Sequence, residues 1–260
     1  MSLQGTKYLS QCDVDNYDRN GYVIVEDAFY PAEVEAMIHA IEAGSSLGPH
    51  TRVRTDAEGK KTKLAIWHQL GNDIWAAAST SPNLVNNVRI LLRQEIAFFH
   101  GKVMLKEAQT GGAWEWHQDY GYWYDQGFLY PRMLSAFVAL DRATRENGCL
   151  SVLKGSHKIG RLNHVQTGTQ FGIEHDRMAL VEPLFECVYC ELAPGSILFF
   201  DCNLLHSSDA NKSDHHRRSF ITAYTALGNP QIKGQLCADE VCQSAAPNAI
   251  LEAARLVPET

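Results

Sequence analysis

From about residue 95 onward, the chain breaks into short runs of β-branched and aromatic residues separated by Gly, Pro and Asn. Many short strands bounded by turn residues are typical of an antiparallel sandwich or jelly roll. The expected strands span residues 96–107, 133–140, 149–153, 185–192, 196–200 and 217–226. The pattern therefore predicts a mainly β fold whose core is a double-stranded β-helix (jelly roll, cupin-like).

Helical patterns flank this region on both sides. Pro31 opens an apolar stripe at helical spacing that ends at Gly44, and residues 82–92 predict a second helix with Ser81 as its cap. The polar, Gly-containing residues 45–63 are expected to form a loop. A further helix is expected near the C-terminus, over residues 248–255.

The length and composition favour one domain. A chain of 260 residues with 45% hydrophobic residues can bury a substantial core. We expect a single domain over residues 1–260. It divides into a mainly helical N-terminal support (1–94), the jelly-roll core (95–228) and a C-terminal tail with its helix (229–260).

Charge and cysteine usage exclude several classes of protein. The net charge is −7 and no long basic run occurs, so no nucleic-acid partner is expected. No apolar run reaches the roughly 18 residues of a membrane span. The first residues lack a signal peptide, and the seven cysteines are scattered, which predicts reduced thiols and a cytoplasmic location. We expect a monomer or homodimer. Cys187 and Cys190 form a C-x-x-C pair in a strand-like run and are expected to pack rather than bind metal.

One short motif carries candidate chemistry, Trp116-His117-Gln118-Asp119. Residues two apart on an extended strand point the same way, so His117 and Asp119 can reach one metal ion. With 11 histidines and 14 aspartates in the chain, about 0.6 such matches are expected by chance. The motif therefore depends on what accompanies it.

Three later residues complete the candidate site. His206 lies 89 residues after His117 and follows an apolar strand, so it can supply a second imidazole. Two histidines and one carboxylate on one face are the ligand set of non-haem Fe(II) oxygenases. Arg217, 11 residues further on, can reach the far carboxylate of a keto-acid co-substrate, and Ser219 shares its strand face. Arg218 competes with Arg217 for this role but faces the other way.

Several segments together resemble the phytanoyl-CoA dioxygenase family of Fe(II)/2-oxoglutarate oxygenases. They include Asp18-Arg-Asn-Gly-Tyr-Val-Ile-Val-Glu-Asp27, the His117 block and the stretch Ala139-Leu-Asp-Arg-Ala-Thr-Arg-Glu-Asn-Gly-Cys-Leu-Ser-Val-Leu-Lys-Gly-Ser-His157. His206, Asn211-Lys212 and Arg217 are similar to the second ligand block and the 2-oxoglutarate arginine. Four segments in the same order make this resemblance specific, and it covers most of the chain.

The resemblance implies a function. His117, Asp119 and His206 would bind Fe(II), and Arg217 with Ser219 would bind 2-oxoglutarate. Lys106 would be a second contact to this co-substrate, chosen from a strand face shared with His100, Lys102 and Met104. A dioxygenase of this kind uses O₂ to hydroxylate a small-molecule substrate and releases succinate and CO₂. Related halogenases have a small residue in place of Asp119, so its presence favours a hydroxylase.

Two other functions stay open at this point. One is a non-catalytic metal-binding jelly roll that acts as a sensor or binding protein. The other is a cupin-type isomerase or hydrolase with a different divalent metal, in which Arg217 and Ser219 would have no evident task. The long segment 156–183, which interrupts the strand pattern, is either an active-site lid or a surface excursion without a role.

Overall fold

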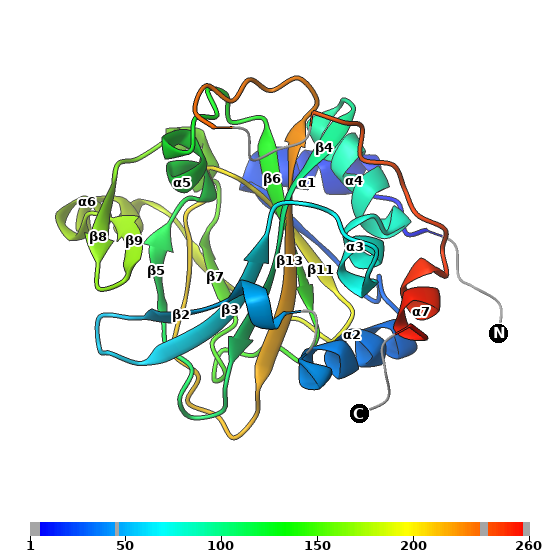
Figure 1. Cartoon of the computed structure of the whole chain (residues 1–260). Coiled ribbons are helices and arrows are strands. Elements are labelled where there is room, and N and C mark those ends of the chain that lie inside the picture. The colour runs from blue at the N-terminus through cyan, green and yellow to red at the C-terminus, as the bar shows by residue number, and fades with distance from the viewer. Residues whose placement is uncertain (1–5, 45–46, 235–238, 257–260) are drawn as a thin grey trace.

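The protein folds around two antiparallel β-sheets that face each other, with most helices outside the larger one (Figure 1). The computed structural model describes residues 6–44, 47–234 and 239–256. Its α-helices are α1 (Gln11–Asn20), α2 (Pro31–Ala43), α3 (Ile74–Ser79), α4 (Pro82–Leu92), α5 (Asp119–Asp125), α6 (His175–Val181) and α7 (Ala249–Ala254). Short 3₁₀ turns are η1 (Gly48–His50), η2 (Ser156–Ile159) and η3 (Glu182–Leu184).

The larger sheet has seven strands in the order β1-β11-β6-β13-β4-β3-β2. These are β1 (Tyr22–Val25), β2 (Thr51–Thr55), β3 (Lys61–Trp67), β4 (Ile96–Lys106), β6 (Met133–Ala139), β11 (Ile197–Asp201) and β13 (Arg217–Ala226). The smaller sheet has the order β10-β7-β12-β5. It consists of β5 (Trp114–His117), β7 (Leu150–Leu153), β10 (Cys187–Cys190) and β12 (His206–Ser208). A separate hairpin pairs β8 (His164–Thr167) with β9 (Gln170–Ile173).

The faces of the large sheet bury two different cores. On β13, Phe220 and Tyr224 pack into the cluster that the outer helices cover, together with Met37 of α2 and Val88 of α4. The alternate residue Ile221 packs between the two sheets. This alternation follows from the two-residue period of a strand. It confirms the predicted jelly roll, and it leaves the inner face of β13 turned toward the smaller sheet.

Close approach of Trp67 to β4 explains a glycine within that strand. A Cβ added to Gly101 would lie 2.4 Å from the Trp67 ring. Trp67 in turn stacks against Phe220, with ring centroids 6.3 Å apart. The indole therefore occupies the space that a side chain at Gly101 would need.

Gly101→Ala is expected to destabilise the fold by about 1–3 kcal/mol, because the buried ring must shift to admit a methyl group. The drop in Tm measures the effect. Gly71→Ala is the matched control, since its added Cβ would meet only Asp73, at 3.8 Å. Equal Tm values for the two variants would contradict the packing described here.

The structure contradicts one loop prediction in the N-terminal part of the chain, and it also has two helices there, α1 and α3, that were not predicted individually. Residues 45–63 were expected to form a loop, but β2 and the start of β3 lie there, and both extend the large sheet. The loop prediction is wrong because polar and basic residues occupy an edge strand, where side chains can face solvent. The helices predicted at Pro31, at residues 82–92 and at residues 248–255 are confirmed as α2, α4 and α7.

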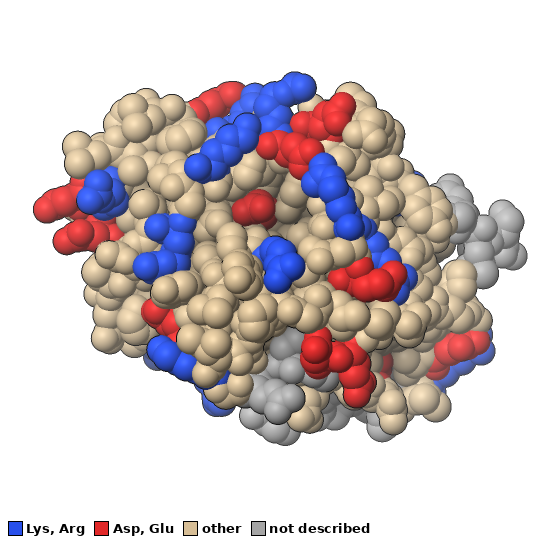
Figure 2. Space-filling view, turned by 90° about the horizontal axis from the view of Figure 1, so that it is seen from above, with Lys and Arg blue, Asp and Glu red and all other residues tan. Residues whose placement is uncertain are grey.

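The long segment 156–183 folds into η2, β8, β9 and α6, and its hairpin packs beside β5. In the described part of the chain, no helix is both long and apolar enough to cross a membrane. On the face seen from above, acidic and basic side chains are interspersed (Figure 2).

Candidate metal and co-substrate site

The motif residues His117 and Asp119 lie where β5 ends and α5 begins. Gln118 between them is extended, with φ −117° and ψ 134°, so the two side chains point the same way as predicted. The buried Gln118 amide donates to the carbonyls of Gly160 and Asn203, both at 2.7 Å. These bonds tie the ligand-bearing turn to two neighbouring segments.

His206 joins the pair through the smaller sheet. It stands directly opposite His117 in the β12–β5 pairing. The Nε2 atoms of His117 and His206 lie 3.8 and 3.9 Å from Asp119 Oδ1. All three residues are buried, and one candidate ligand atom from each lies within 4.8 Å of the others. The structure thus brings together three residues that were predicted to bind one metal ion.

Hydrogen bonds orient both imidazoles for metal binding. His117 Nδ1 contacts the Glu115 carbonyl at 2.7 Å, and His206 Nδ1 contacts the Leu204 carbonyl at 2.9 Å. A carbonyl accepts, so each Nδ1 carries the proton and each Nε2 keeps its lone pair. Burial lowers the pKa of both histidines, and this favours their neutral, metal-binding form.

Asp119 is held as a carboxylate. Burial alone would raise its pKa, but the positive charge of His206 whenever that ring is protonated, the Lys102 ammonium and a hydrogen bond from Ser135 outweigh that effect, and the net pKa is lowered. Ser135 Oγ donates to Asp119 Oδ2 at 2.5 Å. The other oxygen, Oδ1, is the one that faces the histidines. Such a donor set fits a divalent iron with open coordination positions.

Arg217 lies on the inner face of β13, in the opposite sheet, and is completely buried. Its Nη1 donates to Ser219 Oγ at 3.1 Å, its Nη2 lies 4.0 Å from Met104 Sδ, and its Nε has no partner. Burial lowers the pKa of Arg217 to about 10, so it stays charged at neutral pH. Within the described residues no carboxylate pairs with it. A buried cation with a free donor fits a carboxylate-bearing ligand.

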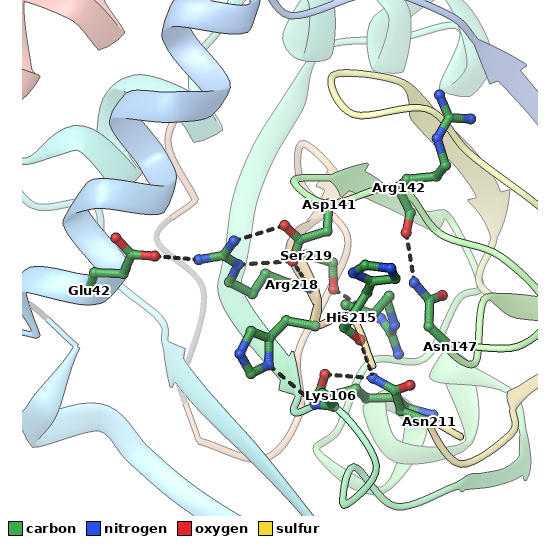
Figure 3. Close-up of polar contacts among 12 residues, drawn as sticks. Glu42, Lys106, Asp141, Arg142, Asn147, Asn211, His215, Arg218 and Ser219 are labelled. Atoms are coloured by element: carbon green, nitrogen blue, oxygen red, sulfur yellow. Dashed lines mark hydrogen bonds and ion pairs between the residues drawn. The ribbon is translucent and has the colours of Figure 1, made fainter. Parts of the chain in front are cut away.

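Arg218 serves a different purpose. Its guanidinium forms a two-point ion pair with Asp141, at 2.8 and 2.9 Å, and Nη1 donates to Glu42 at 2.7 Å (Figure 3). These partners lie on the side of β13 toward α2 and away from the inter-sheet cavity. Arg218 is therefore a structural ion pair, and Arg217 is the arginine with a vacant donor, as the strand alternation predicts.

Lys106 is completely buried opposite Arg217 in the β4–β13 pairing. Its Nζ donates to Ser208 Oγ at 2.8 Å, to the Ser208 carbonyl at 3.2 Å and to the Asp209 carbonyl at 2.5 Å. All three donors of the ammonium are thus used in joining β4 to β12. Its role as a second co-substrate contact stays a prediction.

Two comparisons place the chain among known proteins. The model of the phytanoyl-CoA dioxygenase family matches residues 17–219, which is well over half of the chain. The chain belongs to the phytanoyl-CoA dioxygenase family. It is similar to an ectoine dioxygenase from Sphingopyxis alaskensis, 26% identical over 229 residues, which cover 82% of this chain and 74% of the relative. An L-proline trans-4-hydroxylase from Streptomyces griseoviridis is 24% identical over 229 residues, covering 82% and 85%.

Solved structures show the same fold. EctD from S. alaskensis, solved with 2-oxoglutarate and 5-hydroxyectoine, matches with a TM-score of 0.73 at 24% identity, over 88% of this chain and 82% of that one. The α-ketoglutarate-dependent carbocyclase SnoK from nogalamycin biosynthesis matches with a TM-score of 0.70 at 19% identity, over 90% and 98%. Family and fold together confirm an Fe(II)- and 2-oxoglutarate-dependent dioxygenase that consumes O₂, and the non-catalytic sensor is not favoured.

In this member of the phytanoyl-CoA dioxygenase family, two cavities include His117 and Asp119 in their lining. A narrow inner one of about 30 Å³ includes Met104 and Phe137 in its lining, and both of these contact Arg217. A wider outer one of about 220 Å³ opens toward solvent. Lys102 and Trp114 line both cavities.

Sequence reasoning missed three residues that shape the site. Ser135 and Gln118 hold the ligand-bearing turn, and Lys102 places a half-buried ammonium beside Asp119. No sequence motif marks Ser135 or Gln118 as part of the site. Lys102 shares a strand face with Lys106, but only the structure shows which lysine of that face lines the cavity.

One histidine and the C-x-x-C pair lie outside the triad. His157 Nε2 lies 3.2 Å from the Asp18 carbonyl, so this histidine is structural. Cys190 is buried on β10 as predicted, whereas Cys187 is exposed and does not pack in the core, and both are free thiols. Cys237 lies outside the described residues.

Proposed function

We propose that His117, Asp119 and His206 hold the iron of this dioxygenase, and that Arg217 with Ser219 holds the far carboxylate of 2-oxoglutarate. The observation that carries this proposal is the pairing of two features across the inter-sheet space. One is a buried triad in which the Nε2 atoms of both histidines lie within 4 Å of one carboxylate oxygen, so that all three atoms can reach one ion. The other is the buried Arg217 guanidinium, whose Nε has no hydrogen-bond partner and which pairs with no carboxylate among the described residues.

When bound, iron and 2-oxoglutarate would supply the oxidative chemistry that hydroxylates the substrate, with release of succinate and CO₂. The protein's own residues position the bound groups and shield the site from water. Ser135 keeps Asp119 Oδ2 occupied, so that Oδ1 stays directed toward the histidines. Met104 Sδ is only a weak acceptor beside Arg217, and a carboxylate would readily displace this flexible side chain.

The substrate enters, in this proposal, through the outer cavity. Its walls include Trp114, Tyr122 and Trp123, and the Tyr122 hydroxyl donates to the Phe171 carbonyl of β9. His164 of β8 accepts from the Gln118 backbone N–H at 3.0 Å. The hairpin thereby covers the side of the site next to β5 and limits the access of water. A cavity of about 220 Å³ suits a small molecule, and the similar ectoine dioxygenases and L-proline trans-4-hydroxylase are named for small molecules.

Anaerobic titration with Fe(II) and then 2-oxoglutarate tests the proposal. We expect a weak visible charge-transfer absorption that requires both additions, because the keto-acid end must chelate the iron. Admission of air should then yield succinate. A metal-binding sensor would take up iron but form no succinate, and a cupin-type isomerase or hydrolase would be indifferent to 2-oxoglutarate. Absence of both signals would refute the oxygenase assignment of these residues.

A further inference from the structure

The outer cavity carries an excess of positive charge. Arg52 and Arg54 of β2 line it near the opening, and Lys102 of β4 lines it near the triad. Among the residues that the structure describes, Asp119 is the only acidic one in its lining. The remaining wall is largely aromatic and aliphatic, with Leu64 and Trp123 among its members.

Strand geometry directs both arginines at the cavity. They are two residues apart on β2, so they share one face of the strand, and Arg52 stands opposite Leu64 of β3 in the pairing. The end of β2 is fixed by the Thr55 backbone N–H, which donates to Thr169 Oγ1 at 2.8 Å in the β8–β9 turn. The arginines are thus held on paired and tethered backbone.

Neither guanidinium is neutralised by the protein. In the part of the chain that the structure describes, no carboxylate forms an ion pair with Arg52 or Arg54. By contrast, Arg89, Arg93 and Arg218 each pair with an acidic side chain. Edge strands often carry charges that discourage aggregation, but such charges need not line a cavity.

The bound co-substrates would not remove this excess. Fe(II) and dianionic 2-oxoglutarate together add no net charge, and Arg217 and Asp119 are already assigned to them. Two arginines therefore stay available at the opening, on the route by which a substrate reaches the triad. Arginine binds carboxylate and phosphate oxygens through parallel hydrogen bonds.

We propose that the substrate is an organic anion, whose carboxylate or phosphate group is bound by Arg52 and Arg54 while its hydrocarbon part lies against the aromatic wall beside the triad. This inference rests on the proposed function, because it treats the outer cavity as the substrate pocket. It adds the class of substrate, which neither the metal ligands nor Arg217 specify.

Binding of matched probes tests the proposal. Protein loaded anaerobically with Fe(II) and 2-oxoglutarate is titrated by calorimetry with 4-phenylbutyrate, with its neutral primary amide, and with 3-phenylpropyl phosphate. We expect at least one of the two anions to bind about tenfold tighter than the amide, since an ion pair at a partly desolvated opening contributes on that order. The tighter of the two anions identifies which charged group the arginines prefer.

The double variant Arg52→Gln/Arg54→Gln should bind the amide as the wild type does and lose the preference for the anions. Both positions are exposed, so Gln is expected to be tolerated. Arg177→Gln is the matched control, because Arg177 is exposed on α6 and does not line the cavity. It should keep the full preference.

Two results would overturn the inference: no tighter binding of either anion than of the amide by the wild type, or a preference that survives in the double variant. Failure of the proposed function is recognised separately, by the absence of the absorption that needs iron and 2-oxoglutarate. In that case the same comparison is made in metal-free protein with 2-oxoglutarate present, and the dependence on Arg52 and Arg54 still decides.

Discussion

Asp119→Ala is expected to abolish hydroxylation and to weaken iron binding, because it removes the only carboxylate among the three ligand candidates. The loss in kcat should exceed about 100-fold, since even partners outside the ligand set of a metal commonly contribute 10–100-fold. Succinate release and anaerobic Fe(II) titration measure the two effects. An Asp119→Ala enzyme that still hydroxylates at a comparable rate would refute the ligand assignment.

The matched control is Asp125→Ala at the other end of the same helix. Asp125 is exposed, so its removal changes the charge of α5 without touching the triad. Full activity in this variant, beside an inactive Asp119→Ala, separates loss of a ligand from a general effect on the helix. Equal losses in the two variants would instead point to damage to α5.

Arg217→Met is expected to weaken the binding of 2-oxoglutarate without lowering the stability of the fold. Removing a buried charged donor to the 2-oxoglutarate carboxylate should raise the KM for this co-substrate by about 30-fold or more. The Tm measured without co-substrate should stay unchanged or rise. The substitution replaces a buried cation, which pairs with no carboxylate among the described residues, by an apolar side chain. A structural arginine would show the opposite pattern, a lower Tm with an unchanged KM.

Arg218→Met provides that opposite pattern. It breaks the two-point pair with Asp141 and the bond to Glu42, and should cost about 1–2 kcal/mol of folding free energy. The KM for 2-oxoglutarate should change little, since Arg218 faces α2. If Arg218→Met raised this KM and Arg217→Met did not, the assignment of the two neighbouring arginines would have to be exchanged.

The regular elements of this fold were predictable where side chains repeat at a clear period. The long strand β13 and the helix α4 have the predicted bounds, because each buries a continuous face. The hairpin of β2 and β3 was missed, since its polar strand lies at a sheet edge and has no buried face to create a pattern. Its tethering to residue Thr169 is a contact between distant segments and has no local signal.

The candidate site was likewise predictable only in part. The spacing of His117 and Asp119 was informative, because two residues separated by one extended residue direct their side chains to the same side. Ser135, which binds Asp119, comes from β6 in the opposite sheet and could not be inferred from its neighbours in sequence. Lys106 was predicted from its strand face to be a second co-substrate contact, and this stays a prediction, but the bonds of its ammonium to Ser208 and Asp209 could only be seen in the structure.

The sequence by itself determined the class of fold and the type of chemistry. Strand alternation, turn residues and the identity of three ligand side chains are local properties, and they can be recognised directly in the amino-acid sequence. Only the tertiary structure decided which arginine is buried with an unused donor and no carboxylate partner among the described residues, what holds Asp119 in place, and that Arg52 and Arg54 line the pocket. These are matters of burial and of charge neutralisation, and they depend on which distant segments the two sheets bring within a few ångströms of each other.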